Sequence, residues 1–163
     1  MKTIFAPWRM AYIQGKKPQG CVLCRDSLRM DELIVGEGKT AFVLVNRYPY
    51  TGGHLMVVPF RHLNRIEDIL PEERLELFTL VDLSVRVLKE AMNPEGFNVG
   101  LNLGKAGGAG IDDHLHIHVV PRWGGDTNFM SVIGGVRIIP EDVDRTCALL
   151  KPLFEKLQRE ICG

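Results

Sequence analysis

The chain has 163 residues and no net formal charge, because twenty basic residues balance twenty acidic ones. This length favours a single domain over residues 1–163, which can bury a core without disulfide bonds. A neutral chain has no broad basic surface for nucleic acid or an anionic membrane, so we expect neither as a partner and expect a small anionic substrate. No apolar run has the length of a membrane span and the first residues lack the apolar centre of a signal peptide, so we expect a cytoplasmic protein.

The four cysteines are too few for a disulfide scaffold, and two of them form a Cys-x-x-Cys turn at Cys21 and Cys24. Such a turn can be a redox pair or half of a zinc site, but the thioredoxin-like βαβ setting of a redox pair is missing. Zinc needs two further ligands, and histidines would have to supply them because there is no second Cys-x-x-Cys. Cys147 falls on an apolar helix face and is expected in the core.

The first hundred residues predict strands joined by short connections, and therefore antiparallel pairing. Apolar runs predict these strands at residues 33–35, 40–45, 54–59 and 97–103.

A long helix is predicted from Pro71 to about Asn93, because apolar residues recur every three or four positions. Its main stripe consists of Phe78, Val81, Val85, Leu88 and Met92. The apolar surface is widened by Leu77, Leu80, Leu83 and Val87, so the helix is either buried on two sides or part of a dimer interface.

Two further elements are predicted near the C-terminus. Residues 136–139 read as a short strand, and residues 143–161 as a helix with one apolar face. Pro152 should kink or interrupt that helix, because proline lacks a backbone donor and clashes with the preceding turn. The whole pattern predicts an α+β fold built on an antiparallel sheet.

A glycine-rich loop at residues 104–110 stands just before the histidines of the chain. It lacks the spacing of a Walker loop, but its backbone N–H groups could form an anion-binding concavity with Lys105 beside it. Its glycines include Gly104, Gly108 and Gly110. An ordinary hairpin loop is the alternative.

Three histidines, His114, His116 and His118, alternate with apolar residues in a strand predicted at 114–121. Alternation would place all three on one face of the strand, close enough to surround one phosphoryl group or metal ion. Attack of the middle residue, His116, on a phosphoryl group would give a covalent intermediate, with His114 and His118 positioning groups. The alternative is a zinc hydrolase, but no carboxylate lies in the motif as an obvious base.

The His-φ-His-φ-His-φ-φ pattern at residues 114–120, where φ is apolar, resembles the signature of the histidine triad (HIT) family. The stretches at 46–59 and the Asn102-x-Gly104 element are similar to further HIT motifs. The Pro-Trp-Arg-Met start, the Cys-x-x-Cys turn and residues 97–104 and 121–129 look like the bacterial diadenosine tetraphosphate phosphorylase branch.

This resemblance implies a HIT-like fold, a homodimer, and a nucleotidyl transferase or hydrolase that acts on diadenosine polyphosphates. In that mechanism His116 carries a covalent adenylyl group, which passes to phosphate or to water. Asn46 would lie near the ribose, and Asn102 with the loop after it near the phosphates. The substrate-binding set implied is Asn46, His54, Asn102, Gly104, Lys105, Gly108, Gly110 and Trp123.

The resemblance also implies a structural zinc bound by Cys21, Cys24, His62 and His114, which would remove His114 from direct chemistry. One motif departs from the family: Ala109-Gly110-Ile111 stands where many members have Gly-Gln-Ser, so Lys105 or the loop N–H groups would have to meet the leaving group. Two alternatives stay open, a catalytic zinc and a nucleotide-binding interaction protein with little turnover.

Overall fold

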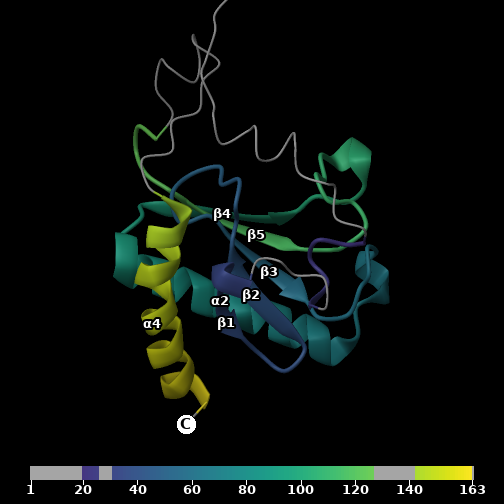
Figure 1. Cartoon of the computed structure of the whole chain (residues 1–163), viewed down its shortest axis with the longest axis horizontal. Coiled ribbons are helices and arrows are strands. Elements are labelled where there is room, and N and C mark those ends of the chain that lie inside the picture. Colours follow the sequence, from purple (N-terminus) through teal and green to yellow (C-terminus); the bar gives the residue numbers. More distant parts are fainter. Residues whose placement is uncertain (1–19, 26–30, 127–141, 163) are drawn as a thin grey trace, which may run out of the picture.

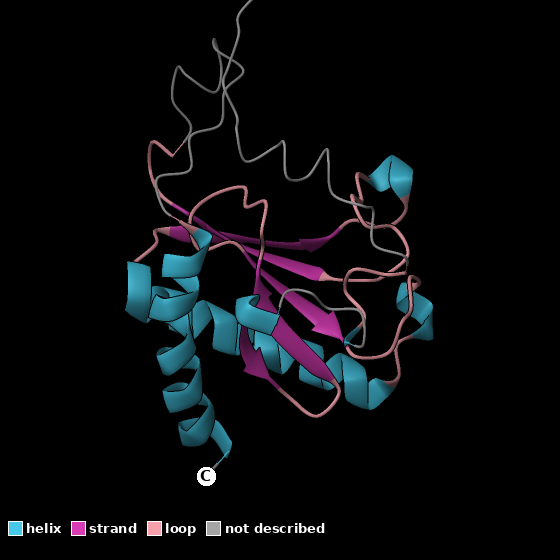
Figure 2. Ribbon diagram, viewed as in Figure 1, coloured by secondary structure: helices cyan, strands magenta, loops and turns pink. Residues whose placement is uncertain are grey.

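The computed structural model describes residues 20–25, 31–126 and 142–162, which form an α+β fold around one antiparallel sheet (Figure 1; Figure 2). The sheet has five strands in the order β1-β2-β3-β5-β4, and all neighbours are antiparallel. The strands are β1 (Ile34–Glu37), β2 (Ala41–Val45), β3 (Leu55–Pro59), β4 (Gly96–Leu101) and β5 (Ile117–Arg122). The predicted fold class and the first four predicted strands are confirmed, with ends that differ by at most two residues.

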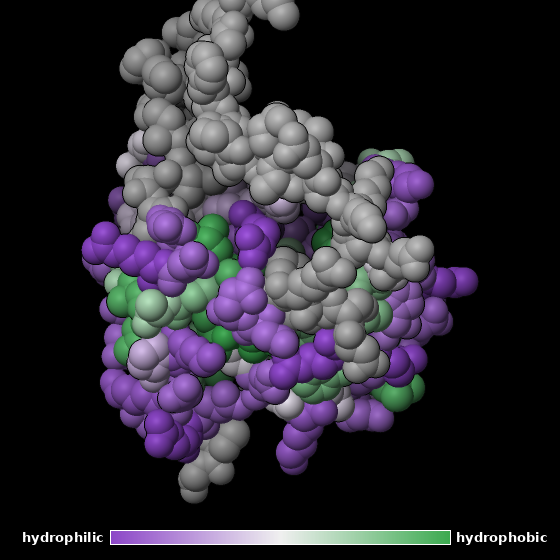
Figure 3. Space-filling model, in the orientation of Figure 1, coloured by the Kyte–Doolittle hydropathy of each residue, from purple (hydrophilic) through white to green (hydrophobic). Residues whose placement is uncertain are grey.

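Among the described residues, two long helices cover the sheet, and short 3-10 turns lie before β1 and in the connections after β3 and β4. They are α2 (Pro71–Met92), α4 (Val143–Cys162), η2 (Asp31–Leu33), η3 (Ile66–Asp68) and η4 (Lys105–Gly107). α2 packs against β2, β3 and β5, whereas α4 packs against β1 and the side of α2 (Figure 1). Of the helices in the described part of the chain, none could span a bilayer. Where Figure 3 colours the surface by hydropathy, hydrophilic side chains predominate, with apolar surface between them.

α2 begins at Pro71 as predicted, because proline at the first helical position loses no hydrogen bond there. Asn93 ends it in the left-handed conformation, with φ 48°. The predicted apolar stripe is partly wrong, because Phe78 is 59% exposed. Since α2 packs on both the sheet and α4, its buried face is centred one position earlier, on Leu77, Leu80, Val81, Leu83, Ser84, Val87 and Leu88.

Pro152 lies inside α4 without interrupting it, so the predicted interruption is wrong, whereas the predicted kink stays a prediction. The two core residues that flank it, Leu150 and Phe154, are fully buried. The Phe154 ring lies against β1, where an ideal Cβ built on Gly36 would stand 2.7 Å from its Cδ1 atom. Burial of two large side chains offsets the cost of proline in a helix interior, which is about 3 kcal/mol. Cys147 is buried on the same helix, as predicted.

The two faces of the sheet have different roles. Ile117 of β5 and Leu77 of α2 line one apolar cavity, so the face that carries Ile117 and Val119 is turned towards α2. His118 therefore points to the opposite face, because neighbouring strand residues alternate. The strand predicted at 136–139 and the N-terminal Pro-Trp-Arg-Met motif lie outside the described residues.

Candidate active site and metal site

The histidine segment is only partly a strand, because β5 begins at Ile117. The prediction of a strand over 114–121 with three histidines on one face is therefore wrong at its N-terminal end. The reason is a contact with a segment far along the chain: the Leu115 N–H donates to the Leu63 carbonyl at 2.7 Å, so this stretch pairs with the chain after β3 and does not continue the strand. His114 lies beside the Cys-x-x-Cys turn, whereas the His116 and His118 rings lie 4.8 Å apart.

His54 and His118 form a hydrogen-bonded pair that fixes the position of one proton. The Tyr50 N–H donates to His54 Nδ1 at 3.1 Å, and the Asn46 amide nitrogen lies 3.3 Å from the same atom. With Nδ1 accepting, the proton of neutral His54 sits on Nε2, which lies 2.9 Å from His118 Nδ1. His118 Nδ1 is then an acceptor, and its Nε2 carries a proton that it can donate. The side-chain amide of Asn102 lies on that side, 3.4 Å from His118 Nε2, and its oxygen is the atom that can accept from this N–H when the amide is turned over.

His116 has the opposite arrangement of donor and acceptor. Its Nδ1 lies 2.8 Å from the His114 carbonyl oxygen, so Nδ1 donates and Nε2 keeps a free lone pair. The side chain is buried, with 5% of the residue exposed. A neutral imidazole with an unprotonated Nε2 is a nucleophile, and the adjacent His118 offers an N–H donor. The pair can therefore attack an electrophilic centre and donate a hydrogen bond to it.

An open space adjoins these two histidines on the sheet. Gly100 of β4 lies directly opposite His118 in the strand register, and a Cβ built on it would meet nothing within 4 Å. The positive φ of Gly53, 76°, turns the chain just before His54, where a Cβ would stand 2.7 Å from Met92 Sδ. These glycines respectively leave room beside His118 and permit the turn that presents His54.

Tyr50 is a site residue that the sequence reasoning missed. Its ring centroid lies 4.6 Å from that of His54 and 5.7 Å from that of His118, and the residue is 43% exposed. It forms a wall of the space beside the histidines. The only signal in the sequence is its position four residues before His54, because no pattern says which way a loop side chain turns.

His118 is expected to stay neutral throughout the pH range 5 to 8. Burial and the neighbouring charge of His116 lower the pKa of His118 from 6.5 to about 4. On acidification, His118 therefore takes up its proton at a lower pH in the folded state than in the unfolded chain. Its contribution to stability is therefore complete above about pH 6.5 and is lost as the pH falls towards 4. Proton NMR of the His118 ring, assigned with a His118→Gln variant, should show no titration above pH 5. A midpoint near 6.5 would contradict the hydrogen-bond assignment.

In the described part of the chain, the polar contacts of the glycine-rich loop and Trp123 are to residues other than His116 and His118. Gly104 and Gly108 have positive φ values, 68° and 87°, around the short turn η4, and Gly110 follows in the same exposed loop. Lys105 Nζ lies 3.7 Å from an Asp112 carboxylate oxygen and its side chain is 86% exposed. Trp123, half-buried after β5, donates its backbone N–H to Asp126 at 3.3 Å. Their roles in substrate binding stay predictions.

The second cluster consists of Cys21, Cys24, His62 and His114, whose ligand atoms all lie within 4.8 Å of one another. Cys21 Sγ and Cys24 Sγ lie 3.3 and 3.7 Å from His114 Nδ1, and Cys24 Sγ lies 3.2 Å from His62 Nδ1. Donor atoms on a tetrahedral zinc stand roughly 3.3–3.8 Å apart, so two thiolates and two imidazoles fit zinc in kind and in spacing. Burial lowers the pKa of His114, which favours the neutral form that binds metal.

His114 has both ring nitrogens engaged at this cluster. Its Nδ1 faces the sulfurs, and its Nε2 lies 3.0 Å from the Pro59 carbonyl oxygen. A backbone carbonyl that accepts from the second nitrogen of a histidine is the usual outer support of a metal ligand. The structure thus groups His114 with the cysteines, and leaves His116 and His118 with His54, Asn46 and Asn102.

Comparison with known proteins agrees with this geometry. A family model described as HIT domain matches residues 27–125. An AP-4-A phosphorylase from Mycobacterium tuberculosis is 48% identical over 118 residues, which are 72% of this chain. An asymmetrical bis(5'-nucleosyl)-tetraphosphatase from Schizosaccharomyces pombe is 32% identical over 84 residues, 52% of this chain. The matched regions span 60% and 46% of those relatives' own lengths.

Solved structures have the same fold. A zinc-bound histidine triad family protein from Mycobacterium smegmatis superposes with a TM-score of 0.70 and 26% identity, over 88% of this chain and 99% of that one. A histidine triad nucleotide-binding protein from Sulfolobus tokodaii superposes with a TM-score of 0.65 and 26% identity, over 79% of this chain and 87% of that one. The family model covers more than half of the chain. The residues that it matches include His54, His116, His118, Asn46 and Asn102. The chain therefore belongs to the HIT family.

Proposed function

We propose that the protein is a nucleotidyl transferase that acts on diadenosine polyphosphates, most specifically a diadenosine tetraphosphate phosphorylase, with His116 as the nucleophile. The observation that carries the proposal is the free Nε2 lone pair of buried His116 beside the Nε2–H donor of His118. The open space over Gly100 leaves room for a phosphate chain at this pair. The names of the two relatives, a phosphorylase and a tetraphosphatase, support the substrate class.

The proposed reaction has two transfers. His116 Nε2 attacks the α-phosphorus of diadenosine tetraphosphate, an N–P bond forms, and the bridging P–O bond breaks. The oxygen leaves with the electron pair as ATP, and the positive charge on the adenylylated ring is stabilised by the hydrogen bond from Nδ1 to the His114 carbonyl. Inorganic phosphate then attacks the same phosphorus to give ADP and free His116. The His118 N–H donates to a phosphoryl oxygen in both steps.

Two further features belong to this proposal. A structural zinc bound by Cys21, Cys24, His62 and His114 would fasten the N-terminal turn to the residue two positions before the nucleophile. A homodimer would cover the edge strand β4, where Val99 is 46% exposed, and the nearby Phe78 of α2. An apolar cavity of about 330 Å³ beside Phe78, lined partly by Leu101 and Ile117, gives that interface a recess.

The product pattern tests the proposal. The protein is incubated with diadenosine tetraphosphate, with and without inorganic phosphate, and the nucleotides are identified by mass spectrometry. We expect ADP and ATP only when phosphate is present. Formation of AMP and ATP without phosphate would identify a hydrolase that uses water instead. Tight binding of the nucleotide with neither set of products would favour the alternative, a nucleotide-binding interaction protein.

A further inference from the structure

The segment between β3 and α2 presents His62 to the metal cluster, although His62 itself is exposed. A polar cavity of about 420 Å³ lies beside it, lined by Arg61, His62, Leu63, Asn64, Asp68 and Asp113. Solvent therefore reaches this proposed ligand, whose ring packs edge-to-face against His114 at a centroid distance of 5.1 Å and is open towards the cavity. Some other contact must fix the backbone on which it sits.

The residues around His62 are tied to the protein at alternate positions. The Pro59 carbonyl lies 3.0 Å from His114 Nε2, and the Leu63 carbonyl accepts from the Leu115 N–H at 2.7 Å. Both of these ties lead to the histidine segment. Between them, Arg61 is tied to a different element, α2.

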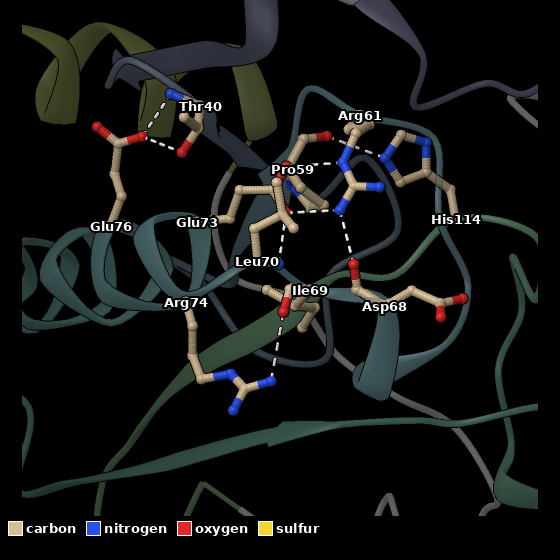
Figure 4. A network of polar contacts seen from close by, with 10 residues as sticks. All are labelled: Thr40, Pro59, Arg61, Asp68, Ile69, Leu70, Glu73, Arg74, Glu76 and His114. Atoms are coloured by element: carbon tan, nitrogen blue, oxygen red, sulfur yellow. Dashed lines mark hydrogen bonds and ion pairs between the residues drawn. The ribbon is translucent and has the colours of Figure 1, made fainter.

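Arg61 makes a two-pronged contact with Glu73 in the first turn of α2 (Figure 4). Its Nε and Nη2 donate to the two carboxylate oxygens at 2.9 and 2.8 Å, and Nη2 also donates to the Asp68 carbonyl at 2.6 Å. Glu73 accepts in addition from the Leu70 N–H at 3.0 Å, at the start of the helix. Such parallel contacts fix geometry as well as adding energy.

The burial of the pair favours its persistence. The Glu73 side chain is only 7% exposed, so its carboxylate has lost most of its water and depends on these donors. Hydrogen bonding from Arg61, against an opposing effect of burial, holds the pKa of Glu73 below its ordinary value. The Arg61 side chain is 47% exposed, and it bridges the buried carboxylate and the surface loop.

We infer that Arg61 and Glu73 form a positioning pair that keeps His62 in the metal site and thereby sets how long the metal stays bound. The inference rests on the proposed zinc site and goes beyond it, because neither residue is a metal ligand. Loss of the pair would free the backbone on one side of His62, whereas the thiolates and His114 would keep their own contacts. Outer contacts of this kind change metal affinity by about 10–100-fold when removed.

The test measures the rate of zinc loss. Zinc-loaded protein is mixed with excess chromogenic chelator, and the absorbance of the chelator complex is followed. Arg61→Met is expected to lose zinc roughly 10–100-fold faster than the parent. Glu73→Gln should act in the same direction, and the double variant should be no faster than the faster single variant, because both changes remove one interaction. Arg65→Gln is the matched control, since Arg65 pairs with Glu67 in the same segment but is 64% exposed, and it should keep the parental rate.

The outcomes separate the inference from the metal site on which it rests. A parent protein that binds no zinc overturns both. One equivalent of zinc in the parent, with equal loss rates for Arg61→Met and Arg65→Gln, overturns the inference alone. Arg61→Lys keeps the charge without the two-pronged contact and should give an intermediate rate, so it carries the test if Arg61→Met does not fold. Cobalt-substituted protein gives a second readout, because a displaced His62 changes the absorption spectrum of the metal.

Discussion

Replacing His116 by asparagine is expected to abolish turnover of diadenosine tetraphosphate while the fold stays intact. Asparagine can still donate to the His114 carbonyl, but it has no nitrogen lone pair to attack phosphorus. Removal of a nucleophile costs about ten-thousandfold or more in kcat. Steady-state rates of ATP release in the presence of phosphate measure this loss, and the circular dichroism spectrum should match that of the parent.

The covalent intermediate gives a sharper form of the same prediction. Without phosphate, rapid quenching of the parent should yield protein that carries one adenylyl group on His116, and the variant should yield none. The N–P bond should be cleaved by acid and survive base, which distinguishes a phosphoramidate from an ester. Lys105→Ala is the comparison variant in this adenylylation experiment. Because Lys105 is paired with Asp112 on the exposed loop and is not the nucleophile of the proposed reaction, this variant should still yield adenylylated protein. A modest decrease in the rate for His116→Asn would refute the assignment of the nucleophile.

Removal of the metal is the second large effect. Zinc that binds only the folded state stabilises it by RT ln(1 + [Zn]/Kd), which is about 4 kcal/mol at a thousandfold excess over Kd. Exhaustive chelation should therefore lower the free energy of unfolding by roughly that amount. Activity should fall with it, because the His114 carbonyl that contacts His116 belongs to a residue of the proposed zinc site. Urea unfolding curves of zinc-loaded and chelated protein measure the loss.

A variant separates a structural metal from a catalytic one. Cys24→Ser removes one thiolate of the proposed zinc site, whose sulfur contacts His62 and His114, and should lower stability and zinc content together. Cys147→Ser is the control among the buried cysteines, because Cys147 lies on α4 and its thiol contacts the Leu33 carbonyl and not the cluster. Complete loss of turnover in a chelated protein of unchanged stability would instead favour a catalytic zinc.

Sequence patterns predicted the elements of this fold because they depend on local periodicity. Pro71 marks the start of α2 in both the sequence and the structure, and the four strands before the histidines need only short apolar runs. The predictions that failed depend on neighbours far along the chain. Phe78 fits a helical stripe as well as Leu77 does, and only the packing of α2 against the sheet and α4 decides which is buried. Pro152 is accommodated because Leu150 and Phe154 are fully buried on either side of it.

The histidines illustrate the same limit at the site. Strict alternation predicted one face for His114, His116 and His118, and it could not foresee that the Leu63 carbonyl would bond the chain just before β5. The resemblance to HIT proteins supplied His54, but its contact with His118 Nδ1 follows from the pairing of β3 with β5. No spacing rule predicts Arg61 with Glu73, because that contact needs the loop to fold back on the helix.

The double use of residue 114 has a consequence for which substitutions the chain can accept. Its side chain belongs to the cluster proposed to bind zinc, while its main-chain carbonyl lies 2.8 Å from Nδ1 of His116, the proposed nucleophile. A carbonyl is common to all amino acids, so a descendant that lost both cysteines could replace the imidazole at 114 if the backbone there were anchored in another way. In the proposed mechanism position 116 has no such freedom, because the His116 ring itself forms the bond to phosphorus. Substitution of residue 114 should therefore occur together with loss of the two cysteines. It should be independent of the chemistry at residue 116.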